Sequence, residues 1–190
     1  VKQETAFPET DHVSMTIDSR KGAALTVKIR KPSWSKTVNI KVNGDVAPAT
    51  DDGSSYLTVT GLVKGKNNIS VQFDMRLYTE AMPDNRNRIA FKYGPVVLAG
   101  QLGKEMPDPL YGTPVLLTDN KNVNEWVRPA GGPLQFELKG VGKPMDVKLV
   151  PFYKTYDQYY SVYWDYFTPA EWVNRKEEYE KAKKAADELE

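Results

Sequence analysis

The sequence predicts an all-β protein, an antiparallel β-sandwich that ends in a solvated C-terminal helix. Short runs in which apolar and polar residues alternate recur along most of its 190 residues. Turn-forming residues separate these runs, and the last segment changes to a charged pattern that is typical of a helix. Regularly spaced alternating runs with turns between them are typical of sandwiches and barrels. The strands form either one sandwich or two β units.

The first expected strands share a period of two, which places one side-chain row toward a core. They are residues 13–17, 25–29, 37–42, 55–60 and 68–73. Asn43-Gly44 directly follows the third of these runs. Both residues tolerate a positive φ, so this dipeptide predicts a tight hairpin turn.

The stretch NRNRIAFKYGPVVLAG at 85–100 predicts a turn that leads into two strands. Residues 88–93 alternate, whereas 95–99 form a continuous apolar run, which indicates a strand covered on both faces. Gly94-Pro95 between them predicts a bend or a bulge. We expect the β-sandwich to span residues 1–103.

The chain changes character at residues 104–133, where proline and glycine are frequent. This composition predicts a long connection with one short strand at 115–118. Strands are expected again at 134–138 and 146–150, with two more inside 151–164. Residues 134–165 therefore form a second β unit or complete the first sandwich.

Residues 166–190 are expected to form the terminal helix. Thr168-Pro169-Ala170-Glu171 is typical of a helix start, with Thr as N-cap, Pro in the first turn and Glu three residues after the cap. Oppositely charged residues four apart indicate a solvated helix that is docked at its first turns. The positions that could be buried are Trp172, Val173, Tyr179, Ala182, Ala186 and Leu189.

The composition argues against several classes of partner and cofactor. With 26 basic and 25 acidic residues the formal net charge is +1, so neither nucleic acid nor a membrane surface is an expected partner. The chain contains no cysteine and one histidine, His12, whereas zinc sites require several such ligands. We therefore expect no metal and no cofactor in this chain.

Aromatic residues are the enriched feature, with four Trp and eleven Tyr. Such rings can stack on sugars, although Tyr and Trp also pack in sheets with one polar edge in water. The stacking candidates are Trp34, Trp126, Tyr156, Tyr160 and Trp164. Asp157 and Asp165 are the candidate carboxylate pair for glycoside hydrolysis, with turn and cap roles as the simpler interpretation. Arg86 and Arg88 are candidates for contacts with a neighbouring domain.

Several motifs, taken in their order along the chain, resemble a known family. They are QETAFPETDHVSMTID with LTVKIRKPSW in residues 1–34, VNG at 42–44, YLTV at 56–59, residues 75–81, the 85–100 stretch and PFYKTYDQYYSVYW at 151–164. Together they are similar to the region that follows the catalytic barrel in β-L-arabinofuranosidase-like hydrolases, glycoside hydrolase family 127. Phe7 and Lys31 depart from the family pattern, which has Tyr and Ile there.

This resemblance implies that the family's chemistry lies outside the chain. The family uses an (α/α)₆ barrel with a cysteine nucleophile, a zinc ion held by cysteines and a glutamate, and a second glutamate as acid/base. None of these residues can be carried over, because the chain has no Cys. We therefore expect a non-catalytic module that packs on the missing barrel, and the start at Val1 fits a fragment or a processed protein.

Two alternatives remain open at this stage. The chain could be a carbohydrate-binding module that contacts plant-wall glycans through exposed aromatics, or an independent enzyme with two facing carboxylates about 5–9.5 Å apart. A parent protein that degrades plant glycans would be expected in the periplasm or outside the cell.

Overall fold

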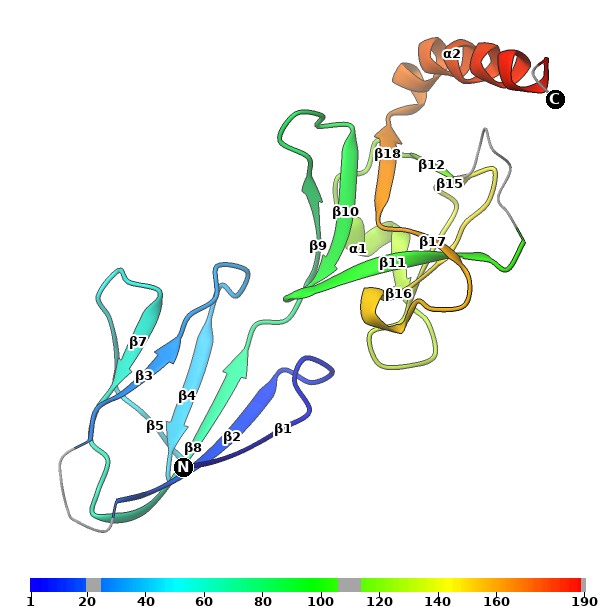
Figure 1. Cartoon of the computed structure of the whole chain (residues 1–190). Coiled ribbons are helices and arrows are strands. Elements are labelled where there is room, and N and C mark those ends of the chain that lie inside the picture. Colours follow the sequence, from blue (N-terminus) through cyan, green and yellow to red (C-terminus); the bar gives the residue numbers. More distant parts are fainter. Residues whose placement is uncertain (20–24, 106–113, 189–190) are drawn as a thin grey trace. The chain divides into compact units, whose positions relative to one another are not determined.

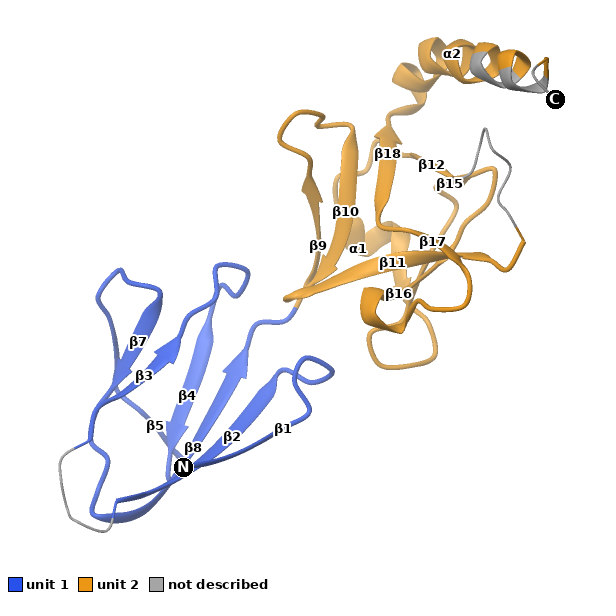
Figure 2. Ribbon diagram, viewed as in Figure 1, with its two compact units in different colours: residues 1–75 blue, residues 76–190 orange. Residues whose placement is uncertain are grey.

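The computed structural model describes residues 1–19, 25–105 and 114–188, without the side chains at 182, 183, 186 and 187. The chain divides into two compact units, Val1–Met75 and Arg76–Glu190 (Figure 2). No helix in the described residues is long and apolar enough to cross a membrane.

Unit 1 is a two-sheet antiparallel sandwich (Figure 1). Its five-stranded sheet has the order β1 (Lys2–Thr5), β2 (His12–Ser19), β8 (Gly65–Phe73), β4 (Val38–Val42) and β5 (Asp45–Val46). Its three-stranded sheet has the order β3 (Val27–Arg30), β7 (Tyr56–Val59) and β6 (Ala49–Asp51). Alternate residues of both sheets, such as Ile69 of β8 and Val59 of β7, form one buried core.

The Asn43-Gly44 turn of unit 1 confirms the predicted hairpin. Val42 pairs with Asp45 across it, and the two turn residues have φ angles of 54° and 98°.

A second polar feature lies at the start of β8, where Asn67 is completely buried. Its amide accepts from the Val63 backbone N–H at 3.0 Å and donates to the Val63 carbonyl at 2.8 Å, so it fixes the loop that enters β8.

In its described residues, unit 2 is built on a mixed ten-stranded sheet, with two short helical elements and one long helix. Its strands are β9 (Leu77–Ala81), β10 (Arg88–Tyr93), β11 (Val96–Gly103), β12 (Val115–Leu117), β13 (Val127–Pro129), β14 (Phe136–Leu138), β15 (Gly142–Lys143), β16 (Lys148–Pro151), β17 (Tyr159–Ser161) and β18 (Tyr163–Phe167). The helical elements are α1 (Val123–Trp126), the 3₁₀ turn η1 (Phe152–Lys154) and α2 (Pro169–Asp187).

The main path of this sheet has the order β13-β14-β16-β11-β10-β18-β12-β15, with β9 paired to β10 and β17 to β11. Among the described strand pairs of the unit, β12 and β18 are parallel and the others are antiparallel. The sheet places β10 and β18, far apart in the sequence, side by side. Arg88 of β10 lies opposite Asp165 of β18.

The centre of the unit 2 core is Trp164, which is fully buried. Its ring packs 6.1 Å from that of Phe91, and it lies over Gly100 of β11. A Cβ atom at residue 100 would stand 2.2 Å from the Trp164 Cζ2 atom, far inside van der Waals contact. Gly100 is therefore required for the close approach of the indole to the strand.

The Gly94-Pro95 segment forms a two-residue hairpin turn. Tyr93 at the end of β10 pairs directly with Val96 at the start of β11, and Gly94 has a φ of 53°. The bend predicted between the two strands is therefore a full reversal of the chain. Pro95 lies in the turn, where its missing N–H removes no ladder hydrogen bond.

The division of the chain differs from the expected boundaries at 103 and 133. Strand β10 (88–93) pairs with β18 at Asp165, and β11 (96–103) pairs with β16 at Val150, so both strands belong to unit 2. The boundary between the units therefore lies after Met75, and residues 134–165 complete the sheet of unit 2. The alternation along β10 predicts a strand but does not identify the strand's partners. The described part of the 104–133 connection contains β12, as expected, and also α1 and β13; residues 106–113 lie outside the described residues.

The start of α2 confirms the predicted capping box. The Thr168 backbone N–H donates to the Glu171 carboxylate at 2.8 Å, and the Glu171 N–H donates to the Thr168 hydroxyl at 3.2 Å. Trp172 and Tyr179 are half-buried, whereas Val173 is 70% exposed, so its expected burial is wrong. The side chains expected to be buried at 182 and 186, and Leu189, lie outside the described residues.

Candidate functional site

Two of the five predicted stacking residues are core residues. Trp126 is 5% exposed, and its indole N–H donates to the Asn120 carbonyl at 3.0 Å. Trp164 is 0% exposed, and its Nε1 has no hydrogen-bond partner within the described structure. Neither ring has a face in solvent, so their assignment as sugar platforms is corrected. The sequence pattern could not separate a buried Trp on a strand from an exposed one.

A third candidate, Trp34, is half-buried in an aromatic cluster of unit 1. Its ring stacks on Phe7 with centroids 6.3 Å apart and lies 5.6 Å from Phe73 at the end of β8. These contacts cover part of the hydrophobic surface of Phe73. The ring therefore has a packing role in unit 1, with only part of its surface in solvent.

The remaining two candidates, Tyr156 and Tyr160, are exposed by 78% and 43%. They belong to a segment that runs from η1 to the first residue of β18 and holds most of the exposed aromatic rings of the described residues. Its exposed members are Phe152, Tyr153, Tyr156, Tyr159, Tyr160 and Tyr163, and the other exposed aromatic residue in the described part of the chain is Tyr56. We call residues 152–163 the aromatic segment. The sequence indicated this cluster, but the exposure of each ring depends on the fold.

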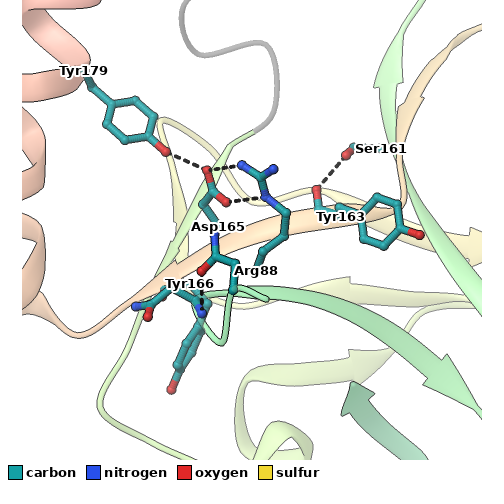
Figure 3. A network of polar contacts seen from close by, with 8 residues as sticks. Arg88, Ser161, Tyr163, Asp165, Tyr166 and Tyr179 are labelled. Atoms are coloured by element: carbon teal, nitrogen blue, oxygen red, sulfur yellow. Dashed lines mark hydrogen bonds and ion pairs between the residues drawn. The ribbon is translucent and has the colours of Figure 1, made fainter. Parts of the chain in front are cut away.

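A polar network joins β10, β18 and α2 (Figure 3). The Arg88 Nε and Nη2 atoms donate to the two carboxylate oxygens of Asp165 at 2.9 and 3.3 Å. The Tyr179 hydroxyl donates to the Asp165 Oδ2 atom at 2.7 Å. The network therefore fastens α2 to the sheet at its third turn, close to where the Trp172 and Tyr179 rings pack 5.2 Å apart.

The electrostatics of this network favour an ionised Asp165. Burial alone would raise the pKa of the carboxyl, but hydrogen bonds from Arg88 and Tyr179 and the positive charge of Arg88 outweigh it, so the pKa is lowered. Burial and the hydrogen bond to Asp165 raise the pKa of the Tyr179 phenol well above its usual range. Tyr179 is thus held as a neutral donor and Asp165 as an anionic acceptor.

We expect Asp165→Asn to loosen α2 at neutral pH. The side chain is 23% exposed, so we expect a loss of about 1 kcal/mol in docking, less than for a fully buried charged hydrogen bond. This corresponds to about fivefold faster amide exchange in α2. Tyr179→Phe is the matched control for the hydroxyl alone, and it should give a smaller increase. Unchanged exchange in both variants would contradict a fastening role.

The same contact gives an acid dependence. Because the folded-state pKa of Asp165 is lowered, its stabilisation is present above the ordinary carboxyl pKa of 3.8 and is lost as the pH falls through the lowered value. We expect the protection factors of the α2 amides, which correct for the pH dependence of intrinsic exchange, to fall on acidification in the wild type and to change less in Asp165→Asn.

The two arginines predicted to contact a neighbouring domain lie in different environments. Arg88 is engaged within unit 2 by Asp165. Arg86 is exposed in the turn before β10, and no hydrogen bond or ion pair involves it in the described structure. The turn itself is closed by Asn85, whose side chain accepts from the Asn87 N–H at 3.0 Å. The interdomain role of Arg86 and Arg88 remains a prediction.

The two candidate catalytic carboxylates belong to separate ion pairs. Asp157 is paired with Lys104 at 3.1 Å and is largely exposed, whereas Asp165 is held by Arg88. A general acid in a glycosidase needs a raised pKa, and that of Asp165 is lowered. In the described residues no group of three acidic or His side chains could hold a metal ion. The observed arrangement therefore offers structural contacts and an exposed aromatic surface.

The described fold defines the chain as a pair of β-sheet units. Residues 1–75 match the family model described as "Beta-L-arabinofuranosidase, GH127 middle domain". This confirms the resemblance to glycoside hydrolase family 127 in the first unit, and the match ends at the boundary between the units. Residues 106–166 match a second model, described as a domain of unknown function.

Solved structures share the fold over most of the chain. A protein described as a glycoside hydrolase aligns with TM-score 0.64 and 18% identity, covering 86% of this chain and 32% of that one. A GH127 beta-L-arabinofuranosidase from Geobacillus stearothermophilus T6 aligns with TM-score 0.61 and 16% identity, covering 87% and 30%.

A third structure, described as a GH127 beta-arabinofuranosidase, aligns with TM-score 0.60 and 19% identity, covering 88% of this chain and 32% of that one. The chain thus spans about a third of the length of these proteins. No curated protein matches the chain.

Proposed function

We propose that this chain is a non-catalytic β-sandwich module of a glycoside hydrolase related to family 127, and that it packs on and supports an (α/α)₆ catalytic barrel. The observation that carries the proposal is the match of residues 1–75 to the GH127 middle domain. The structural alignments support it, because they cover most of this chain and leave about two thirds of each glycoside hydrolase structure unmatched.

The described polar residues support the absence of catalysis in this chain. The carboxylates that could act in hydrolysis, Asp157 and Asp165, each pair with a cation. With no cysteine in the sequence, the family's cysteine nucleophile and its cysteine zinc ligands have no counterpart here. The reaction of the whole protein would therefore depend on residues of the barrel.

Two measurements test this function. The purified chain should release no product above background from an aryl β-L-arabinofuranoside, and sustained hydrolysis would overturn the non-catalytic assignment.

In the Geobacillus GH127 enzyme, deletion of the region aligned with this chain should lower the Tm and the yield of soluble protein. If the deleted enzyme keeps the Tm and activity of the full enzyme, the supporting role is wrong.

A second candidate function is carbohydrate binding to plant-wall glycans. It is favoured by the exposure of Tyr156 and Tyr160 within the aromatic segment. An aromatic ring with a polar edge in water is suited to lie against the apolar face of a sugar while its hydroxyl bonds to the ligand.

A further inference from the structure

A hollow at one end of β17 brings together one ring of the aromatic segment and three polar side chains. It has a volume of about 440 Å³ and is lined by Lys104, Asp157, Gln158 and Tyr159. The hollow is open to solvent, and the Lys104 and Asp157 side chains that line it are 78% and 83% exposed. Tyr159 lies opposite Gly103 at the end of the β11–β17 pairing. Because glycine has no side chain, the residue opposite Tyr159 does not cover its ring.

The backbone at Asp157 explains how three consecutive residues line one hollow. In an extended strand, residues 157, 158 and 159 would alternate between two faces. Asp157 has a φ of 59°, a left-handed conformation that turns the chain between η1 and β17. Aspartate is among the non-glycine residues that adopt this conformation most often. The turn therefore allows its carboxylate, the Gln158 amide and the Tyr159 ring to share one hollow.

The chemistry of these groups selects a class of ligand. The Lys104 ammonium and the Asp157 carboxylate lie 3.1 Å apart and offset each other's charge, so the hollow has no excess charge for an anion or a cation. Ammonium, carboxylate and amide groups together provide donors and acceptors for hydroxyls. The Tyr159 ring is 44% exposed and provides an apolar surface. A neutral sugar carries both hydroxyls and apolar C–H faces.

We propose that the hollow formed by Lys104, Asp157, Gln158 and Tyr159 is a binding subsite for a neutral sugar residue of a polysaccharide. Tyr159 stacks on the sugar ring, and the three polar side chains bond to its hydroxyls. The rings beside it, including the Phe152–Tyr160 pair with centroids 5.5 Å apart, offer apolar surface for adjoining parts of the glycan. This inference rests on the second candidate function and names its site.

Affinity electrophoresis and calorimetry of the full chain with arabinan, arabinogalactan and rhamnogalacturonan test the subsite. We expect saturable binding to at least one of these glycans, and a loss of about tenfold in affinity for Tyr159→Ala, the size expected for one aromatic contact. Lys104→Ala should also weaken binding. Tyr56→Ala is the matched control, because Tyr56 is 43% exposed but belongs to unit 1, and this variant should bind like the wild type.

The outcomes separate the site from the functions proposed above. Binding that survives in Tyr159→Ala would overturn this subsite but leave carbohydrate binding in place. No binding to any of the three glycans would overturn both the subsite and the second candidate function, while the supporting role would stand. A dimer in sedimentation analysis that Tyr159→Ala abolishes would instead assign the surface to a second copy of the chain.

Discussion

Replacement of Trp164 by alanine is expected to destabilise residues 76–190 by about 3–5 kcal/mol, the usual cost of removing a buried Trp side chain. The ring is fully buried, contacts Phe91 and lies directly over Gly100, so its loss leaves a cavity that the sheet cannot easily close. Urea unfolding followed by far-UV circular dichroism measures the loss. Hydrogen exchange should locate it in β10 and β11, while β2 and β8 keep their protection.

The neighbouring residue provides the control for this prediction. Tyr163 precedes Trp164 on β18 and is 51% exposed, so Tyr163→Ala should change the unfolding free energy by about 0.5 kcal/mol or less. Equal effects of the two substitutions would contradict a core position for Trp164. They would also restore it as a candidate for sugar stacking, because a ring that can be removed at small cost is not required by the core.

The second large effect is expected in unit 1. Asn67→Ala should cost about 2–3 kcal/mol, because it removes a fully buried side chain and leaves the Val63 N–H and carbonyl groups without their partner. The loop that enters β8 should lose order together with the β2–β8 pairing. Thermal unfolding and amide exchange of unit 1 provide the measurement.

Asn68→Ala is the matched control for Asn67. Asn68 is the next residue on β8 and is exposed, and its side chain accepts from the Thr16 hydroxyl at 3.2 Å. A substitution there should cost well under 1 kcal/mol, as is usual for exposed polar contacts. If Asn68→Ala proved the more damaging of the two, the inward position of Asn67 in the structure would be wrong.

Local chemistry made several elements of the fold predictable. Asn43-Gly44 has few alternatives to a tight hairpin, since both residues adopt positive φ. Thr168 and Glu171 define the start of α2 because they satisfy each other's backbone N–H groups. In such cases, the residues that specify the structure are adjacent in the sequence, so no knowledge of the remaining chain is needed.

Strand partners and ring exposure were not predictable in the same way. The alternation of β10 is the same whether it pairs within residues 1–103 or, as observed, with β18 at Asp165. Trp126 and Tyr156 are both aromatic residues near turns, yet one is buried and the other is 78% exposed. These differences arise from contacts between segments distant in sequence, and a periodic pattern carries no information on such contacts.

The order of strands at the centre of unit 2 also determines how the unit would respond to tension. β9 and β18 both run antiparallel to β10, which lies between them and pairs with each. Pulling Leu77 and Phe167 apart would therefore slide the strands along one another, and several ladder hydrogen bonds, which lie across the strands, would carry the load together. Such a geometry resists mechanical extension better than one in which the bonds open singly. Force applied between these two residues should be borne by the sheet until β9 or β18 slides past β10.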